Sequence, residues 1–141
     1  MAVNQLAVFI ENQQGSLGAV ARLLADSGVD LQALSIADTQ NYGILRMIVN
    51  DNDLALKVLK ENGMIATVTA VVAVEIPHSI GGLADVLGIL SEAGVNVEYI
   101  YAFIGTSGTN ANVVLRVGDN AKAEEALVKG GVRLLTEADL A

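Results

Sequence analysis

Two hydrophobic patterns alternate along the chain. In some runs most positions are apolar, as in Val3–Ile10 and Tyr42–Val49, and runs of β-forming residues bounded by turn residues are typical of strands. In other stretches apolar residues recur every third or fourth position, as Leu17, Val20 and Leu24 do, which predicts one buried stripe of a helix. In the first half, these patterns predict strands at 3–10, 29–37, 42–49 and 64–69.

Polar residues and glycines mark where the helices of the first half begin and end. We expect Ser16 to cap the first helix and Gly28 to end it in the left-handed conformation. Asp51 or Asn52 is expected to cap the second helix, which Gly63 stops. A hairpin turn is predicted at 38–41, between the second and third strands.

The same pattern then occurs a second time, which indicates an internal duplication. Agreement in phase over both helical segments is hard to produce by chance. Two additional residues in the second copy are placed in its Gly105–Asn110 turn. We place the boundary near Thr69 and Ala70, which gives domains 1–69 and 70–141. The matches include Gly15-Ser16-Leu17 with Gly81-Gly82-Leu83 and Gly28-Val29-Asp30 with Gly94-Val95-Asn96, 66 positions apart, and Asp51-Asn52 with Asp119-Asn120, 68 apart.

Each copy therefore has the order strand, helix, strand, strand, helix, strand. This βαββαβ order predicts an α+β, ferredoxin-like unit: an antiparallel four-stranded sheet with both helices on one face. In the second copy the expected strands are 71–76, 95–103, 111–117 and 132–136, and the expected helices are 82–93 and 121–129.

Several strands are apolar on both faces, although a sheet with water on one side should alternate apolar and polar residues. In the third strand, Leu45 and Met47 lie on one face, while Ile44 and Ile48 lie on the other. We therefore expect the two copies to pair, and the chain to form a homodimer. The alternative is that a loop or the C-terminal tail covers the second face.

Composition then removes several classes of function. The net charge is -8, with 8 basic and 16 acidic residues, and such a surface repels nucleic acid and anionic lipid. With no Cys and a single His, thiol chemistry and the common zinc sites are excluded, and we expect no metal and no cofactor. No targeting segment or membrane span is expected, so a cytoplasmic protein is predicted.

The loop before the first helix has the chemistry to hold an amino acid. Gly15 allows a close approach of the backbone, and the Ser16–Gly18 amides begin the helix with unpaired N–H groups that favour a carboxylate. Asn12 offers a donor and an acceptor, and Asp30 would take the ammonium if a neighbouring copy presents it. The same residues are also compatible with ordinary turn and cap chemistry.

At these residues the chain resembles the ACT domain family, and as a whole it resembles small stand-alone proteins made of two tandem ACT domains. The resemblance rests on Asn12-x-x-Gly15-x-Leu17 followed by Gly28-Val29-Asp30. It implies a regulatory module that binds small amino acids between paired modules. Carried over, it implies ligand-binding residues Asn12, Gly15, Ser16, Leu17 and Asp30 in the first copy and His78, Gly81, Gly82, Leu83 and Asn96 in the second.

The two implied sites are chemically unequal. His78 stands where the first copy has Asn12, and Asn96 stands where it has Asp30. The family often has Pro before the loop glycine, whereas this chain has Gln14 and Ile80. We favour the first-copy loop as the working site, with the second copy kept for pairing.

A histidine, two tyrosines and an arginine are further candidates for chemistry. His78 lacks a partner that would make it a general base. Tyr99 and Tyr101 would wall a ligand pocket or pack in a core or interface, and core or interface packing is the stronger expectation. Arg46 would pair with an acid, reach the surface or bind a carboxylate.

The leading hypothesis is a non-enzymatic sensor that binds a free amino acid at ACT–ACT interfaces and changes its own association or controls an amino-acid metabolic enzyme. The alternatives are a structural or interaction subunit with vestigial sites and a small enzyme on the ferredoxin-like fold.

Overall fold

The computed structural model describes residues 3–38, 41–104 and 110–140. They divide into two compact units: the first unit is Asn4–Thr69, and the second unit is Val3 with the residues from Ala70 onward. The turn expected at 38–41 lies partly outside the described residues, and the turn expected at Gly105–Asn110 lies almost wholly outside them.

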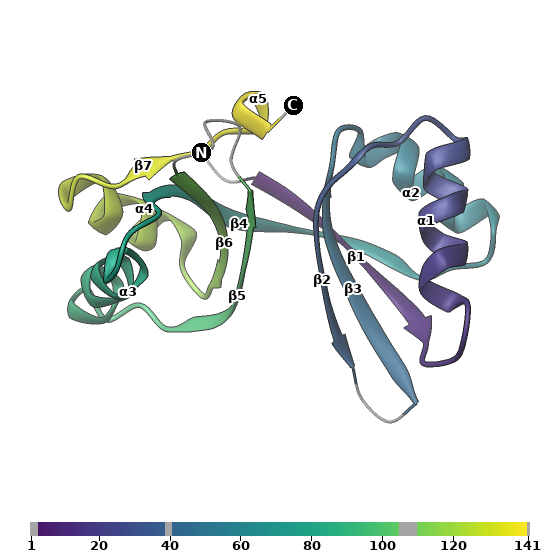
Figure 1. Cartoon of the computed structure of the whole chain (residues 1–141), viewed down its shortest axis with the longest axis horizontal. Coiled ribbons are helices and arrows are strands. Elements are labelled where there is room, and N and C mark those ends of the chain that lie inside the picture. The colour runs from purple at the N-terminus through teal and green to yellow at the C-terminus, as the bar shows by residue number, and fades with distance from the viewer. Residues whose placement is uncertain (1–2, 39–40, 105–109, 141) are drawn as a thin grey trace. The chain divides into compact units, whose positions relative to one another are not determined.

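The first unit is an antiparallel sheet in the order β2-β3-β1-β4 with two helices on one face (Figure 1). Its register pairs Leu6 of β1 with Met47 of β3, and Leu34 of β2 with the same Met47. The elements are β1 (Val3–Glu11), α1 (Ser16–Asp26), β2 (Leu31–Asp38), β3 (Tyr42–Val49), α2 (Asn52–Glu61) and the start of β4 (Ala66–Pro77).

The core of the first unit lies between this sheet and its helices. Alternate residues of β1 and β3 are buried against the apolar stripes of α1 and α2, as the helical spacing predicts. Each fully buried leucine contributes roughly 1.5–3 kcal/mol to folding. The core residues include Leu6, Val8, Val20, Leu24, Leu45, Met47 and Leu59.

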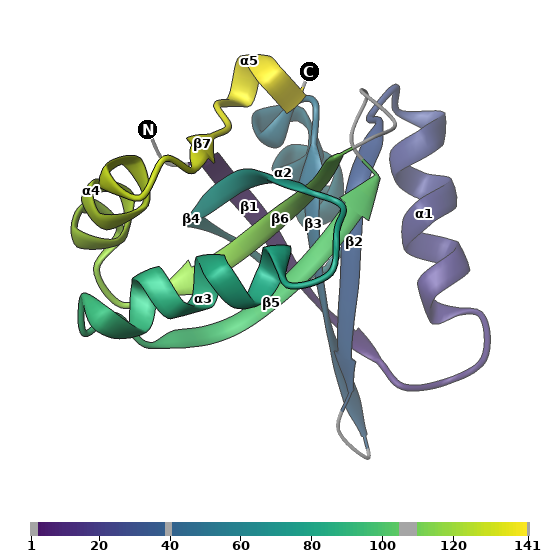
Figure 2. The same cartoon turned by 60° about the vertical axis from the view of Figure 1, so that its left-hand side comes forward.

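The second unit repeats this architecture, with strand order β7-β4-β6-β5. In Figure 2 its helices α3 and α4 lie along one side of its strands. The core packs alternate residues of β4 and β6 against Val86, Leu90 and Leu127 of the helices. The elements are α3 (Gly82–Glu92), β5 (Val97–Ile104), β6 (Asn110–Val117), α4 (Asn120–Lys129), β7 (Arg133–Leu134) and α5 (Glu137–Leu140).

The chain is thus a mixed α+β protein with the ferredoxin-like βαββαβ fold, as the sequence predicts. Local geometry agrees between the copies. Asp51 and Asp119 cap α2 and α4 by accepting hydrogen bonds from the Leu54 and Lys122 amides at 3.0 and 3.1 Å. Gly28 is left-handed after α1, with φ 83°, as expected.

Three expectations about caps and strands are wrong. Ser16 does not cap α1, because the cap is Gly15 in the left-handed conformation, and no side chain among the described residues bonds to this helix end. The strands expected at 64–69 and 71–76 form one strand, β4, because no Gly or Pro interrupts the β-forming residues between them. The last strand shrinks to Arg133–Leu134.

The short helix α5 explains the early end of that last strand. The Thr136 amide donates to Asp139 Oδ2 at 2.8 Å, and the Asp139 amide donates to Thr136 Oγ1 at 3.4 Å. These reciprocal bonds are a capping box, which starts a helix where a strand was expected. In the part of the chain that the structure describes, no helix is long and apolar enough to cross a membrane.

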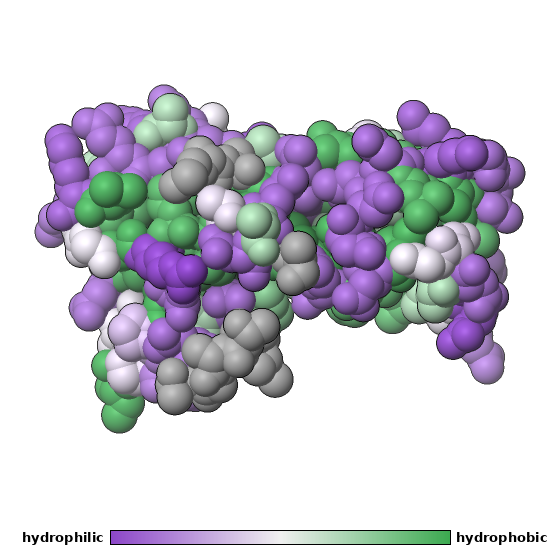
Figure 3. Space-filling model, turned by 90° about the horizontal axis from the view of Figure 1, so that it is seen from above, coloured by the Kyte–Doolittle hydropathy of each residue, from purple (hydrophilic) through white to green (hydrophobic). Residues whose placement is uncertain are grey.

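Apolar side chains reach the surface at the open edge strand of each unit. In the first unit, Leu34 and Ile36 of β2 are 52% and 43% exposed. In the second unit, Ile100 of β5 is 38% exposed at the matching position. Figure 3 shows apolar surface (green) between polar residues on one face.

Candidate functional site

The loop before α1 is held by a short set of main-chain hydrogen bonds. The Gln13 amide donates to the Glu11 carbonyl at 2.9 Å, and the Ser16 amide donates to the Gln13 carbonyl at 3.2 Å. The Ala19 amide then bonds to the carbonyl of Gly15, at 2.9 Å. Gly15 has φ 87°, a conformation that disfavours any residue with a Cβ.

The loop before α3 has the same geometry. The Ser79 amide donates to the Pro77 carbonyl at 2.9 Å, and the Gly82 amide donates to the Ser79 carbonyl at 3.2 Å. The Asp85 amide bonds to the Gly81 carbonyl at 2.9 Å, and Gly81 has φ 87°. The duplication therefore extends to the bonds that shape both loops.

These bonds change which helix amides are available to a ligand. The Ser16 amide, expected to be unpaired, is used within its loop. The next two amides of each helix, those of Leu17 and Gly18 in α1 and of Leu83 and Ala84 in α3, have no hydrogen-bond partner among the described residues. Unpaired amides at a helix start carry partial positive charge and favour a carboxylate.

Gly82 has a structural role in its loop. A Cβ at this position would lie 2.6 Å from the carbonyl oxygen of Pro77, closer than real contacts allow. The first copy has Ser16 at the matching position. The end of β4 and the start of α3 thus approach each other in a way that only glycine accommodates.

We call the loop before α1 the first loop and the loop before α3 the second loop. A cavity of about 360 Å³ lies beside the second loop. It brings together His78 and Leu83, two of the residues implied by the family resemblance. Gly81 and Gly82 do not line it; they shape the loop instead. Its lining also includes Ser79, Ile100, Tyr101, Ala102 and Val113.

The register of β5 explains which side chains face this cavity. Ile100 lies opposite Leu115, and Ala102 lies opposite Val113; both partners belong to the core beneath the helices. Because side chains alternate along a strand, Ile100 and Ala102 share the helix side with Leu83, and the side chain of Tyr101 between them points to the other face. Tyr101 is buried, in line with the packing role that the sequence favours.

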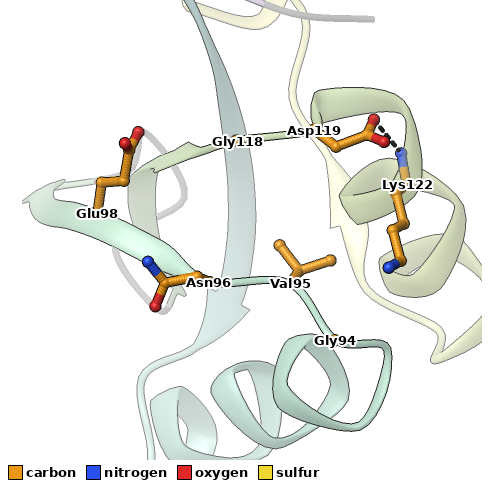
Figure 4. A pocket seen from close by; sticks show the side chains of 7 residues that line it. All are labelled: Gly94, Val95, Asn96, Glu98, Gly118, Asp119 and Lys122. Atoms are coloured by element: carbon orange, nitrogen blue, oxygen red, sulfur yellow. Dashed lines mark hydrogen bonds between the residues drawn. The ribbon is translucent and has the colours of Figure 1, made fainter.

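Asn96 lies at a second cavity of about 320 Å³, shown in Figure 4. This cavity lies between the start of β5 and the start of α4, and Gly118 and Lys122 line it from the α4 side. The Lys122 side chain extends toward Gly94 (Figure 4), where a Cβ would lie 3.4 Å from its Nζ. Glu98, which also lines it, is 3.5 Å from the Nε of Arg116.

The matching place in the first unit is occupied by the protein's own Asn50 side chain. The Asp30 amide donates to Asn50 Oδ1 at 2.9 Å, and the Asn50 amide donates to the Asp30 carbonyl at 3.2 Å. In the second unit this position is Gly118, which has no side chain, and Lys122 stands where the first copy has Leu54. The two copies therefore differ at the start of the strand that follows the first helix of each unit, where Asp30 and Asn96 lie. We call this part of the expected site its strand-start half.

The two halves of each expected site lie at opposite ends of a helix. Asn12 and Gly15 precede α1, and Asp30 follows it; α1 has 11 residues, about 16 Å of rise. His78 and Asn96 are separated in the same way by α3. A loop and a strand start therefore do not come together within one unit.

An electrostatic cluster of the second unit involves Glu75, Arg133 and Asp139. Asn110 Nδ2 donates to Glu75 Oε1 at 2.7 Å, and Arg133 pairs with both Glu75 and Asp139. The bond from Asn110, and then the Arg133 guanidinium, hold the pKa of Glu75 below its ordinary value. Bonds from the amide and hydroxyl of Thr136 lower the pKa of Asp139.

This cluster stabilises the C-terminal end of the chain, and both carboxylates stay ionised rather than poised for proton transfer. Over residues 3–38, 41–104 and 110–140, no group of three or more His, Asp or Glu side chains could hold a metal ion. The described part of the chain therefore offers binding geometry at its loops.

Comparison with known proteins places this geometry in a family. The family model described as an ACT domain pair matches residues 1–141. Protein BT0572 from Bacteroides thetaiotaomicron has 43% sequence identity and a TM-score of 0.93, over 99% of this chain and 96% of that chain. None of the curated proteins compared with the chain matches it.

Two more distant structures share the fold. The regulatory subunit of aspartate kinase from Thermus thermophilus, in its ligand-free form, has 19% identity and a TM-score of 0.64 over 90% of this chain and 91% of that chain. That of Thermus flavus has 19% identity and a TM-score of 0.60 over 91% and 92%. The duplicated βαββαβ unit, the paired glycine loops and the match over the full sequence together show that this chain belongs to the ACT domain pair family of regulatory domains.

Proposed function

We propose that the protein is an amino-acid sensor without catalytic activity of its own. Residues 1–69 and 70–141 act as its two ACT domains, and a free amino acid binds where a helix-start loop of one domain meets the strand start of another. The cavity beside His78 and Leu83, with the unpaired amides of Leu83 and Ala84 at the start of the same helix, carries this proposal.

The chemistry of the two halves supports a zwitterionic ligand. The helix-start amides suit the carboxylate. Asn96, exposed at the start of β5, offers an amide oxygen to the ammonium and an amide nitrogen to the carboxylate. Because α3 separates these halves within one unit, the neighbouring domain has to supply the second half.

Ligand binding at an interface between two domains would be coupled to the association of those domains by linkage. A ligand that contacts two domains stabilises the arrangement in which both sets of contacts are made. We propose a homodimer in the cytoplasm and, as the regulated partner, an enzyme of amino-acid metabolism. The shared fold with regulatory subunits of aspartate kinase supports that kind of partner.

The closed strand start of the first unit favours a structural role for part of the chain. Asn50 occupies the place that is open beside Gly118, and Glu11 puts a negative charge next to the first loop, where a ligand carboxylate would approach. The sequence alone favours the first loop as the working site. The geometry supports the second loop more strongly, with a vestigial site at the strand start of the first copy.

A thermal-shift panel with the twenty amino acids tests the proposal. A ligand at 100 times its dissociation constant should stabilise the protein by about 2.7 kcal/mol, which raises the Tm by several degrees for a domain of this size. We expect a selective rise for some amino acids. If none of the twenty changes the Tm at millimolar concentration, the sensor proposal is wrong, and the structural role remains.

A further inference from the structure

The cavity beside the second loop has a mostly apolar lining with a few polar groups. Leu83, Ile100 and Ala102 present apolar side chains to it, and Val113 forms part of its base. Among the described residues that line it, none is acidic and none is Lys or Arg. The polar side chains near it, those of His78 and Ser79, belong to the loop at its margin, next to the helix start.

From this lining we infer that the ligand of the second unit is an α-amino acid with an apolar side chain, such as valine, leucine, isoleucine or phenylalanine. The inference rests on the proposed function and adds the ligand class. The carboxylate lies at the Leu83 and Ala84 amides, and the side chain enters the apolar part of the cavity between α3 and β5.

Size and energetics both favour this class. A volume of about 360 Å³ is at the lower end of the range for small-molecule sites. Burying a hydroxyl or amide against this lining without a partner costs about 1–3 kcal/mol. This penalty weakens the binding of polar amino acids of the same shape, whereas burial of an apolar side chain strengthens binding.

The matching positions of the first unit differ in polarity. Pro77 of the second loop corresponds to Glu11, whose Oε2 accepts a hydrogen bond from Gln13 Nε2 at 2.6 Å. His78 corresponds to Asn12, and Ser79 to Gln13. The first loop thus surrounds its helix start with acid and amide groups, and the apolar preference belongs to the second unit.

Isosteric ligands test the inference on the full-length protein by isothermal titration calorimetry. Valine and threonine have nearly the same shape, as do leucine and asparagine. We expect threonine to bind at least about tenfold more weakly than valine, and asparagine at least about tenfold more weakly than leucine. Equal or tighter binding of threonine and asparagine overturns the inference and leaves the proposed sensor standing. Binding of no amino acid overturns both.

Matched variants locate the effect. Leu83 and Leu17 are both 42% exposed at the same position of their helices, so Leu83→Ala and Leu17→Ala should cost similar stability. Leu83→Ala should weaken leucine binding about tenfold or more while changing glycine binding less, because glycine has no side chain to contact Leu83. Leu17→Ala should weaken leucine binding much less than Leu83→Ala does, because Leu17 does not line this cavity.

A second pair of alanine variants keeps the test valid if a variant of the first pair fails to fold. Ile100→Ala removes apolar surface from the cavity, and Ile65→Ala in the first unit is its control, because Ile65 is exposed and does not line the cavity. Ile100→Ala should weaken leucine binding, and Ile65→Ala should not. If both alanine variants of the first unit weaken binding as much as those of the second, the apolar site is not where we place it.

Discussion

Individual glycines shape the second loop for different physical reasons. Gly81 has a positive φ, which strains any residue with a Cβ. Gly82 has ordinary helical geometry but no room, because the Pro77 carbonyl lies against it. The loop thus depends on two adjacent glycines, and each can be tested separately from ligand binding.

Gly82→Ala should destabilise the protein by about 1–3 kcal/mol, since the added methyl forces apart the end of β4 and the start of α3. Gly88→Ala in the same helix is the control, because a Cβ there meets nothing within 4 Å. It should stabilise the protein by about 1 kcal/mol. Urea unfolding measures both, and equal stability of Gly82→Ala and the unaltered protein would contradict the close contact.

Aspartate caps provide a second test at single residues. Asp51→Ala and Asp119→Ala each remove one hydrogen bond to a helix amide. Each variant should lose about 1 kcal/mol of stability. The two losses should be similar, because the caps have the same geometry; thermal unfolding would contradict this if one variant were unaffected.

At the scale of elements, the C-terminal segment is held by charge. Arg133 of β7 pairs with Glu75 of β4 and with Asp139 of α5, so one guanidinium joins three elements. Leu135 and Leu140 of this segment are also buried, but the charge cluster is the part of its attachment that depends on pH.

Acid should therefore loosen this segment. Glu75 and Asp139 have lowered pKa values in the folded protein, so their contribution is fully present above their unfolded-state pKa values. It is lost as the pH falls below about 4, where the unfolded chain binds protons more readily. Urea midpoints measured between pH 7 and pH 3 should fall with pH.

Arg133→Ala should lower the midpoint at pH 7 and reduce its fall toward pH 3. Arg22→Ala is the control, because Arg22 and Asp26 form a highly exposed pair, 3.4 Å apart, on α1, and such pairs contribute little. An unchanged pH dependence in Arg133→Ala would show that the cluster does not cause the acid sensitivity.

The elements differ in how far the sequence predicts them. Tyr42–Val49 is found as predicted, and the helix starts agree within a residue, because the caps and apolar stripes act locally. The continuity of β4 and the short β7 depend on pairing partners and on the Thr136 capping box, which strand propensity does not include.

The sequence predicts only part of the candidate site. The sequence around the loop before α3 points to His78 and Leu83, and both residues line the cavity. Ile100 belongs to β5 and Lys122 belongs to α4. The fold brings them to the cavities, and their positions in the sequence do not predict this. The closure of the first strand start by Asn50 likewise depends on a contact across 20 residues.

At the scale of the whole molecule, the proposed dimer needs a surface. β2 is an edge strand with Leu34 and Ile36 exposed, and exposed apolar edge strands tend to pair with another chain. Leu34→Lys should shift the protein toward monomer in sedimentation velocity experiments. Val128→Lys on α4, where the valine is 60% exposed, should not.

The strand-start half of the site can be tested by giving the second copy the residue that the first copy has at the matching position. Gly118→Asn should close the cavity beside Asn96, as Asn50 does in the first unit, and weaken amino-acid binding about tenfold or more if that cavity completes the site. Since a Cβ at Gly118 meets nothing within 4 Å, the variant should fold. Unchanged affinity would show that the Asn96 side takes no part.

The difference between Asn50 and Gly118 also has a genetic consequence. A protein that carries one fold twice can accumulate mutations in one copy while the other preserves folding and assembly. Descendants of such a duplication can acquire a different binding preference through a few substitutions around one loop. The unequal halves of this chain are what that route of divergence would leave behind.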